Sequence, residues 1–123
     1  MRIKIIGLLV ALFLLFPLNA NAWSEKDTLW EGAYLLAHVA DWGQTRDIAL
    51  QCSQGLYYEM NPVIGRCPNV HWVNTYFLGT ALLHIGVANL LPQKYRRMFQ
   101  AGTLGMELNF VNNNSNIGLT IKF

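Results

Sequence analysis

Apolar residues lie in four long blocks along the 123-residue chain, and short polar segments separate these blocks. The first block, residues 5–18, follows a short basic start. The other three predict helices over about residues 28–50, 70–91 and 98–111, because each is longer than the roughly four to eight residues usual for a strand.

The first predicted helix, residues 28–50, begins at a capping sequence. Asp27-Thr28 predicts its N-cap, and Glu31 places a negative charge in the first turn, where the helix dipole favours it. Asp41 lies near the middle, and a central Asp costs about 2.5 to 3.5 kcal/mol on membrane-insertion scales. This helix is therefore expected to cross a bilayer poorly.

The second predicted helix, residues 70–91, contains no Asp, Glu, Lys or Arg and ends before Pro92. At ~1.5 Å per residue, its length matches a hydrocarbon core of ~30 Å. The length and the lack of charge together predict a transmembrane helix.

The third predicted helix, residues 98–111, is short for a membrane span and carries Gln100 and Glu107. The Asn-rich run at 112–116 favours turns and predicts the end of this helix. Residues 117–123 alternate apolar with small or polar side chains, which is a strand pattern. They predict a short extended C-terminal tail that folds back on the helices.

Residues 1–22 have the layout of a secretory signal peptide. A basic start precedes an apolar run, and Ala20-Asn21-Ala22 supplies the small residues of a cleavage site. The sequence predicts cleavage after Ala22 and a single helical membrane domain over residues 23–123, located in a cell envelope of the Gram-negative type. An uncleaved N-terminal anchor is the alternative.

The composition favours a membrane protein. The chain is 53% hydrophobic and 13% charged, about half the charged fraction of an ordinary soluble domain. Of its nine basic residues, Arg2 and Lys4 leave with the signal peptide, so seven basic residues balance seven acidic ones. A formally neutral chain offers no electrostatic surface for a nucleic acid. The sequence therefore predicts an all-α fold, a small helical membrane bundle of two to three membrane-associated helices.

Two arrangements in the inner membrane are open. If all three helices crossed, the loop at 51–69 would face the cytoplasm and the basic cluster at 94–97 would face outward, against the positive-inside tendency. If helix 28–50 lies in the interface instead, the loop is periplasmic, and we favour this arrangement. Cys52 and Cys67 would then form a disulfide that closes a loop of about 15 residues. Two free thiols are the alternative.

Each predicted helix carries an ionisable side chain well inside it, namely Asp41, His84 and Glu107. His38, Asp41 and Thr45 share one face of the first helix. Ionisable residues within membrane helices are functional-site candidates by default. We therefore predict a buried polar cluster that consists of His38, Asp41, Thr45, His84 and Glu107.

Two interpretations of this cluster stay open. As structural contacts, the side chains would fix the packing of the helices. As a functional site, His38, Asp41, His84 and Glu107 would be metal ligands or proton carriers, since imidazoles and carboxylates suit a first-row divalent metal. The chain has no HExxH motif, paired CxxC motif or nucleophile elbow, so the sequence predicts no catalytic residue and no cofactor.

The segment 57–68, YYEMNPVIGRCP, connects the first two predicted helices. Asn61-Pro62 disfavours helix at Asn61, and Glu59 is expected to reach free amide groups at the start of the second helix. A scaffold that orients the two helices is favoured over a site in the loop, because no chemistry can be named for it.

Two short motifs, Asp41-x-x-x-Thr45 and Glu59-x-Asn61-Pro62, stand before a long apolar helix. In this respect residues 34–91 resemble small helical membrane proteins of bacteria and phages, in which a D-x-x-x-T helix precedes an E-x-N-P turn. The resemblance implies a helical membrane domain without an assigned activity. It also implies that the five motif residues, including Pro62, act as a linked set.

These observations predict a non-enzymatic structural or interaction component of the cell envelope. Its expected partners are the lipid bilayer and either an envelope protein or further copies of the chain. A membrane-embedded metal-binding protein or enzyme is the first alternative, and a channel-like or lysis-promoting oligomer is the second.

Overall fold

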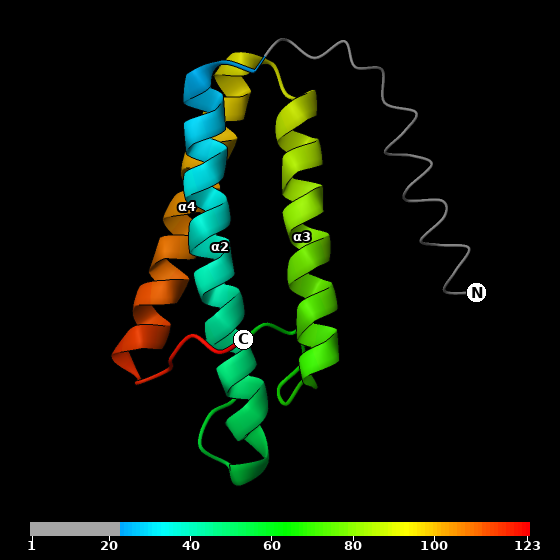
Figure 1. Ribbon diagram of the computed structural model, residues 1–123, viewed down its shortest axis with the longest axis vertical. Helices are drawn as coiled ribbons and strands as arrows, with labels where there is room; N and C mark the ends of the chain where they lie inside the picture. The colour runs from blue at the N-terminus through cyan, green and yellow to red at the C-terminus, as the bar shows by residue number, and fades with distance from the viewer. Residues whose placement is uncertain (1–22) are drawn as a thin grey trace, which may run out of the picture.

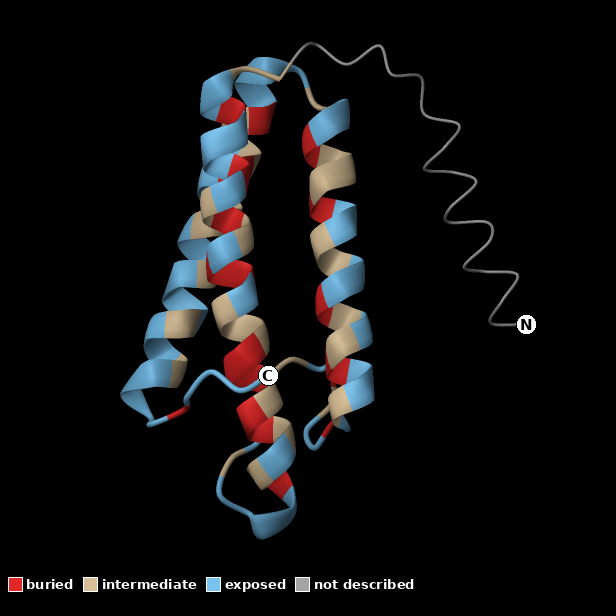
Figure 2. Ribbon diagram, in the orientation of Figure 1, coloured by how far each residue is buried: buried red, intermediate tan, exposed pale blue. Residues whose placement is uncertain are grey.

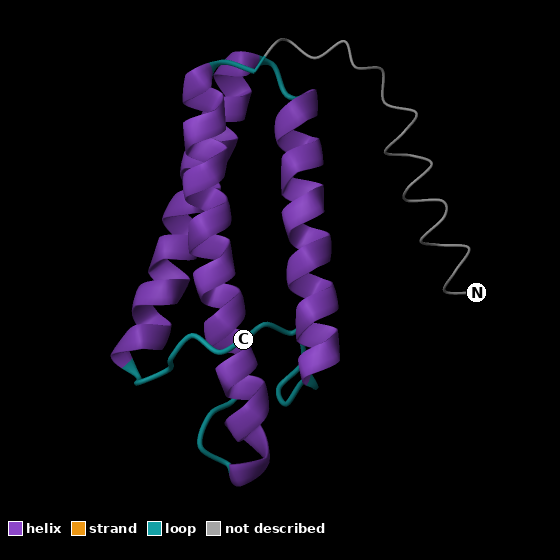
Figure 3. Cartoon of the chain, viewed as in Figure 1, coloured by secondary structure: helices purple, strands orange, loops and turns teal. Residues whose placement is uncertain are grey.

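The computed structural model describes residues 23–123, so the predicted signal peptide and its cleavage site lie outside the described residues. Three long helices account for most of this part of the chain (Figure 1). They are α2 (Glu25–Gln51), α3 (Val70–Leu90) and α4 (Gln93–Asn116), and a short 3-10 turn, η1 (Cys52–Gln54), follows α2. Residues 23–123 contain no strand (Figure 3). The predicted all-α class is confirmed.

The helix directions follow from the residues that pair between them. Each of three side-chain pairs between α2 and α4 joins residues 69 positions apart, so these two helices run parallel. The pairs are Asp27–Arg96, Glu31–Gln100 and His38–Glu107. Helix α3 runs antiparallel to α2, as Figure 1 shows. Phe77, early in α3, contacts His38, whereas His84, later in α3, contacts Glu31 nearer the start of α2. The result is an up-down-up arrangement.

Helix α2 begins three residues before the predicted start at Thr28. Ser24 is the N-cap: its hydroxyl accepts a hydrogen bond from the Asp27 amide, and the Asp27 carboxylate accepts one from the Ser24 amide. This reciprocal pair is a capping box. The prediction that Asp27-Thr28 forms the cap was therefore wrong, although Asp27 takes part in it.

Helix α4 is longer than the predicted range of 98–111 at both ends. It begins directly after Pro92, so the basic segment lies within its first turns. It also continues through the Asn-rich run, because Asn114 donates to Asp41 at 2.9 Å and Ser115 accepts from Gln44 at 2.9 Å. These tertiary bonds outweigh the local turn preference, and the helix ends only before Gly118, whose φ is +91°.

The C-terminal tail folds back against α2, in agreement with the predicted extended tail, although its alternating pattern forms no strand in residues 117–123. One hydrogen bond joins the two backbones, from the Lys122 amide to the Gly43 carbonyl. The Thr120 amide and hydroxyl both donate to the Asp47 carboxylate, at 2.8 and 3.0 Å. A Cβ atom at position 43 would collide with the Ile121 side chain, so Gly43 is what lets the tail approach.

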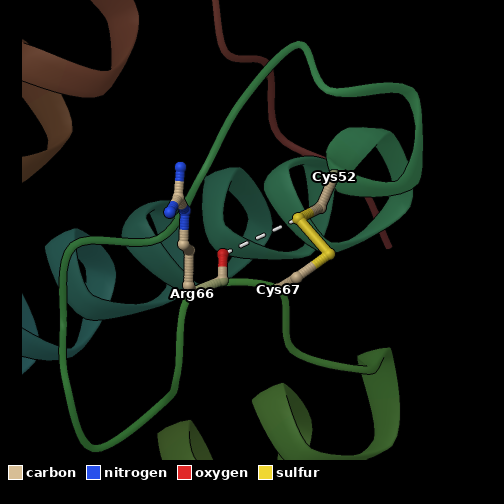
Figure 4. Close-up of a disulfide and its surroundings, with 3 residues drawn as sticks. All are labelled: Cys52, Arg66 and Cys67. Carbon is tan, nitrogen blue, oxygen red and sulfur yellow. Dashed lines mark hydrogen bonds between the residues drawn. A yellow bond between two sulfur atoms is a disulfide. The ribbon is translucent and has the colours of Figure 1, made fainter.

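The loop between α2 and α3 is closed by a disulfide between Cys52 and Cys67, whose Cα atoms are 5.6 Å apart (Figure 4). This confirms the predicted bond. Cys52 Sγ lies 3.7 Å from the Arg66 carbonyl oxygen, a contact only, since an oxidised sulfur has no hydrogen to donate. Glu59 does not reach α3; it accepts from the Asn61 amide at 2.8 Å, and the Asn69 side chain caps α3 instead.

Reducing the Cys52–Cys67 disulfide should lower the free energy of unfolding by about 3 kcal/mol, because the unfolded chain regains the freedom of a closed loop. Denaturant unfolding followed by circular dichroism, with and without reductant in nonionic detergent, measures this change. The double variant Cys52→Ser/Cys67→Ser is the control, whose stability reductant should not alter. Equal stability of the oxidised and reduced protein would contradict the prediction.

The distribution of buried residues is unusual. The apolar core is small and centres on Ile64, Val73 and Phe77. Buried positions occur along all three helices (Figure 2), and many of them hold charged or amide side chains. The buried polar residues are Asp27, Glu31, His38, Gln44, Thr45, Asp47, His84, Arg96 and Gln100. Many large apolar side chains point outward instead, and Leu36 is 76% exposed.

Among the described helices, none is long and apolar enough to cross a membrane. The predicted transmembrane helix at 70–91 and the predicted membrane bundle therefore lack support as spanning elements. The prediction rested on the absence of charged residues from this segment. It gave too little weight to neutral polar side chains, such as Asn74, His84 and Asn89, which lower the mean hydropathy of α3.

Candidate functional site

A stripe of polar side chains runs along α2 and faces the other two helices. Its members alternate at spacings of four and three residues, which keeps them on one side of a helix. They are Asp27, Glu31, Tyr34, His38, Asp41 and Thr45. Side chains of α3 and α4 meet this stripe in three layers, each built around an ionisable pair or cluster.

The first layer is an ion pair between Asp27 and Arg96, both 0% exposed, with 3.0 Å between Oδ2 and Nη1. Arg96 also donates to the carbonyls of Ala88 and Leu91, at 2.7 and 3.1 Å. Burial alone would raise the pKa of Asp27, but hydrogen bonds from Ser24 and Arg96 outweigh burial and hold that pKa below its ordinary value. The carboxylate is therefore ionised inside the fold.

The second layer joins His84 of α3 to Glu31 of α2. His84 Nδ1 lies 2.8 Å from Glu31 Oε1, and Nε2 lies 2.7 Å from the Thr103 hydroxyl. The imidazole is stacked between the rings of Tyr34 and Phe99, with centroids 3.5 and 4.4 Å away. Both nitrogens and both ring faces thus have partners.

The third layer joins His38 of α2 to Glu107 of α4, with 2.8 Å between Nδ1 and Oε1. His38 Nε2 lies 3.0 Å from the Phe77 carbonyl oxygen. Burial would lower the pKa of His38, but the bonds to Glu107 and to the Phe77 carbonyl raise it above its ordinary value. Because both nitrogens face acceptors, the protonated imidazole fits the site.

A cavity of about 670 Å³ opens beside the third layer, between α2, α3, α4 and the loop. Asp41 lines it and accepts a hydrogen bond from Asn114. Burial raises the pKa of Asp41 to about 7, and the negative charges of Glu107 and Glu59 add to the effect. A carboxyl that ionises near neutral pH makes this cavity the candidate functional site.

The structure divides the predicted polar cluster. His38, Asp41, Thr45 and Glu107 line the cavity together, and His84 lies apart in the second layer. Of the E-x-N-P turn, Glu59 and Asn61 also line the cavity, whereas Pro62 does not. Of the four proposed metal ligands, only His38 and Glu107 contact each other, since Asp41 lines the cavity beside them and His84 pairs with Glu31. Within residues 23–123 no group of three or more His, Cys, Asp or Glu residues could hold a metal ion. The metal interpretation is therefore not supported.

Several residues of the polar interior were not predicted from the sequence, in particular Asp27, Glu31, Tyr34 and Arg96. The four-and-three spacing that grouped His38 with Asp41 continues toward the N-terminus through these α2 residues. Extending that count along the helix would have found them. Arg96 offered no such signal, because a basic residue near a helix end is normally solvated.

Comparison of the chain with protein-family models, curated proteins and solved structures finds no match. The resemblance to small helical membrane proteins of bacteria and phages stays a prediction, and the geometry of the chain carries the functional argument.

The raised pKa values predict that the protein loses stability as the pH rises. Asp41 has an ordinary pKa of 3.8 and a folded value of about 7, so its contribution is present below pH 4 and is lost as the pH passes 7. The pKa of His38 is also raised above its ordinary value of 6.5, so the contribution of His38 to stability is likewise lost as the pH rises. We expect a fall of about 2 to 3 kcal/mol between about pH 4.5 and pH 8, after allowance for the partial exposure of Asp41.

Denaturant unfolding across this pH range measures the effect. The Asp41→Asn variant should lose most of the pH dependence, because the amide does not titrate. The control is Glu25→Gln, which removes an exposed carboxylate from the same helix and should keep the full dependence. An unchanged slope in Asp41→Asn would show that Asp41 is not the titrating group.

Proposed function

We propose that this protein is a non-enzymatic component of the cell envelope whose apolar outer surface contacts lipid. The observation that carries the proposal is the placement of side chains: many ionisable and amide groups are buried between the helices, and many large apolar groups face outward. Monomeric soluble proteins rarely expose wide apolar surfaces. The predicted signal peptide supports the envelope location.

The exposed apolar side chains occur on every long helix. On α2 they form a stripe, and a groove of about 550 Å³ beside it is lined mainly by apolar side chains, namely Leu29, Leu35, Leu36 and Val39. The others include Leu78, Leu82 and Leu83 on α3, and Met98, Met106 and Leu108 on α4. A single protein partner would cover one face of the bundle, whereas lipid can contact all three helices.

The polar interior supports the same proposal. Partners for the buried charges are supplied inside the bundle, so lipid around the exterior need not solvate them. Hydrogen-bonded polar contacts also hold helices together where apolar surroundings give no hydrophobic drive for packing. The interior layers therefore act as structural contacts in this proposal.

Flotation with neutral phosphatidylcholine vesicles tests lipid association. Purified protein, freed of detergent in the presence of vesicles, should float with them and stay bound in high salt, because the attraction is apolar. The double variant Leu36→Glu/Leu82→Glu places charges on two exposed apolar faces and should float several-fold less. Lys26→Glu is the matched control, since it adds the same side chain at an exposed polar position in the first turn of α2.

Two results would overturn the proposal. One is wild-type protein that stays dispersed as a monomer or a defined oligomer without vesicles and does not float with them. The other is equal flotation of the double variant and the Lys26→Glu control, which would mean that the exterior apolar residues do not contact the lipid.

A further inference from the structure

The side chains that line the cavity beside the third layer include more acidic than basic groups. The acidic and histidine residues that line it are His38, Asp41, Glu59 and Glu107, and no Lys or Arg is among the described residues that line it. The proton on His38 balances Glu107, to which it is bound at 2.8 Å. Asp41 and Glu59 are left as two negative charges without a basic partner in the lining.

The three carboxylates belong to different segments that converge on this space. Asp41 comes from α2, Glu107 from α4 and Glu59 from the loop that the disulfide closes. Glu107 uses Oε1 for His38, whereas its Oε2 is buried and accepts no hydrogen bond. A buried carboxylate oxygen without a donor is costly. A positive charge in the cavity beside this oxygen would offset part of that cost.

Aromatic rings form much of the rest of the lining, from Tyr34, Tyr58, Tyr76, Phe77 and Phe110. The face of an aromatic ring attracts a cation within about 6 Å. One of these rings already does so, since the Arg66 guanidinium lies 4.2 Å from the centroid of Tyr58. Carboxylates combined with ring faces are the surroundings in which proteins bind organic ammonium groups.

We propose that this cavity binds a small organic cation that carries an ammonium group on a compact apolar body. The volume of about 670 Å³ is in the range of small-molecule sites. A bare metal ion fits the lining poorly, because the described residues supply no group of three close ligands. The ammonium group lies among Asp41, Glu59 and Glu107, and the apolar body lies against the rings.

Binding is coupled to pH through the groups that face Asp41. These are His38 on the same helix, Glu107 and Asn114 on α4, and Glu59 on the loop. Protonation of Asp41 as the pH falls removes an attracting charge, so affinity for the cation falls with it.

Isothermal titration calorimetry of the full chain in nonionic detergent at pH 8 tests the site. The probe is choline, and its control is 3,3-dimethylbutan-1-ol, which has the same shape without the charge. We expect choline to bind and the neutral alcohol to bind at least about tenfold more weakly, since the carboxylates favour only the cation. Choline affinity should fall several-fold between pH 8 and pH 6.

Two isosteric variants remove the attracting charges, Asp41→Asn on α2 and Glu59→Gln on the loop. Each should weaken choline binding about tenfold, and Asp41→Asn should also reduce the pH dependence. Because Glu59 lies outside the helices, its variant keeps the test valid if Asp41→Asn perturbs folding. The control Glu25→Gln removes an exposed carboxylate from α2 and should bind choline as the wild type does.

Equal affinity for choline and the neutral alcohol would overturn the proposal, as would wild-type affinity in a folded Glu59→Gln variant. An absence of heat with choline at millimolar concentration would also overturn it. Because the titration contains no lipid, it can fail while vesicle flotation succeeds, and the reverse holds as well.

Discussion

Replacing Arg96 with methionine should lower the free energy of unfolding by about 3 to 5 kcal/mol. The guanidinium is 0% exposed and is bound to Asp27, also 0% exposed. Methionine would fill much of the space but leave an ionised carboxylate buried without its main partner. Denaturant unfolding in nonionic detergent, followed by circular dichroism, measures the loss.

The neighbouring residue supplies a matched control. The Arg97 side chain is 43% exposed and approaches Asp27 only to 3.5 Å, so Arg97→Met should cost about 1 kcal/mol or less. The double variant Asp27→Asn/Arg96→Met should be more stable than Arg96→Met alone, because it removes the unpaired charge. Equal losses in the two single Arg variants would contradict burial as the cause.

Replacing His84 with leucine should have an effect of similar size, about 3 to 5 kcal/mol. The substitution removes the partner of the Glu31 carboxylate and breaks the stack between Tyr34 and Phe99. Gln100, which donates to Glu31 Oε2 at 2.8 Å, would remain as a neutral donor. The same unfolding measurement applies.

His71 on the same helix provides the comparison, because it is exposed and His71→Leu should change stability by less than about 0.5 kcal/mol. Adding Glu31→Gln to His84→Leu should restore part of the loss, since the neutral amide is cheaper to bury than an unpaired carboxylate. Equal stability of His84→Leu and His71→Leu would contradict the pairing of His84 with Glu31 as the cause. So would a further loss of stability when Glu31→Gln is added to His84→Leu.

The sequence predicted the three helices but placed their ends by local rules that tertiary bonds overrode. The end of α3 was nearly correct, because Pro92 stops it in any context. The Asn-rich run at 112–116 was read as a turn, yet Asn114 and Ser115 bond to α2 and stay helical. A single sequence does not show which side chains have partners across the fold.

The candidate site was predictable in its residue types and not in its pairing. Asp41, His84 and Glu107 were found because ionisable groups inside apolar helices are costly. Their distribution over two layers depends on the parallel arrangement of α2 and α4, which also hides Arg96 and Asp27 from the solvent. Local spacing within one helix cannot supply that information, and the combined metal site was the resulting error.

The constant separation of 69 positions between the partners on α2 and α4 has a consequence for alignment. If α4 slid by one turn, roughly 5.4 Å, Asp27 would face Gln100, Glu31 would face Leu104 and His38 would face Val111. The ion pairs Asp27–Arg96 and His38–Glu107 between α2 and α4 would be lost in the same step, together with the hydrogen bond from Gln100 to Glu31. Helices that pack through apolar side chains often tolerate such a shift, whereas helices joined by buried charged pairs do not. The buried polar pairs therefore select one alignment of α2 and α4, at the expense of stability that an apolar interface between the two helices would provide.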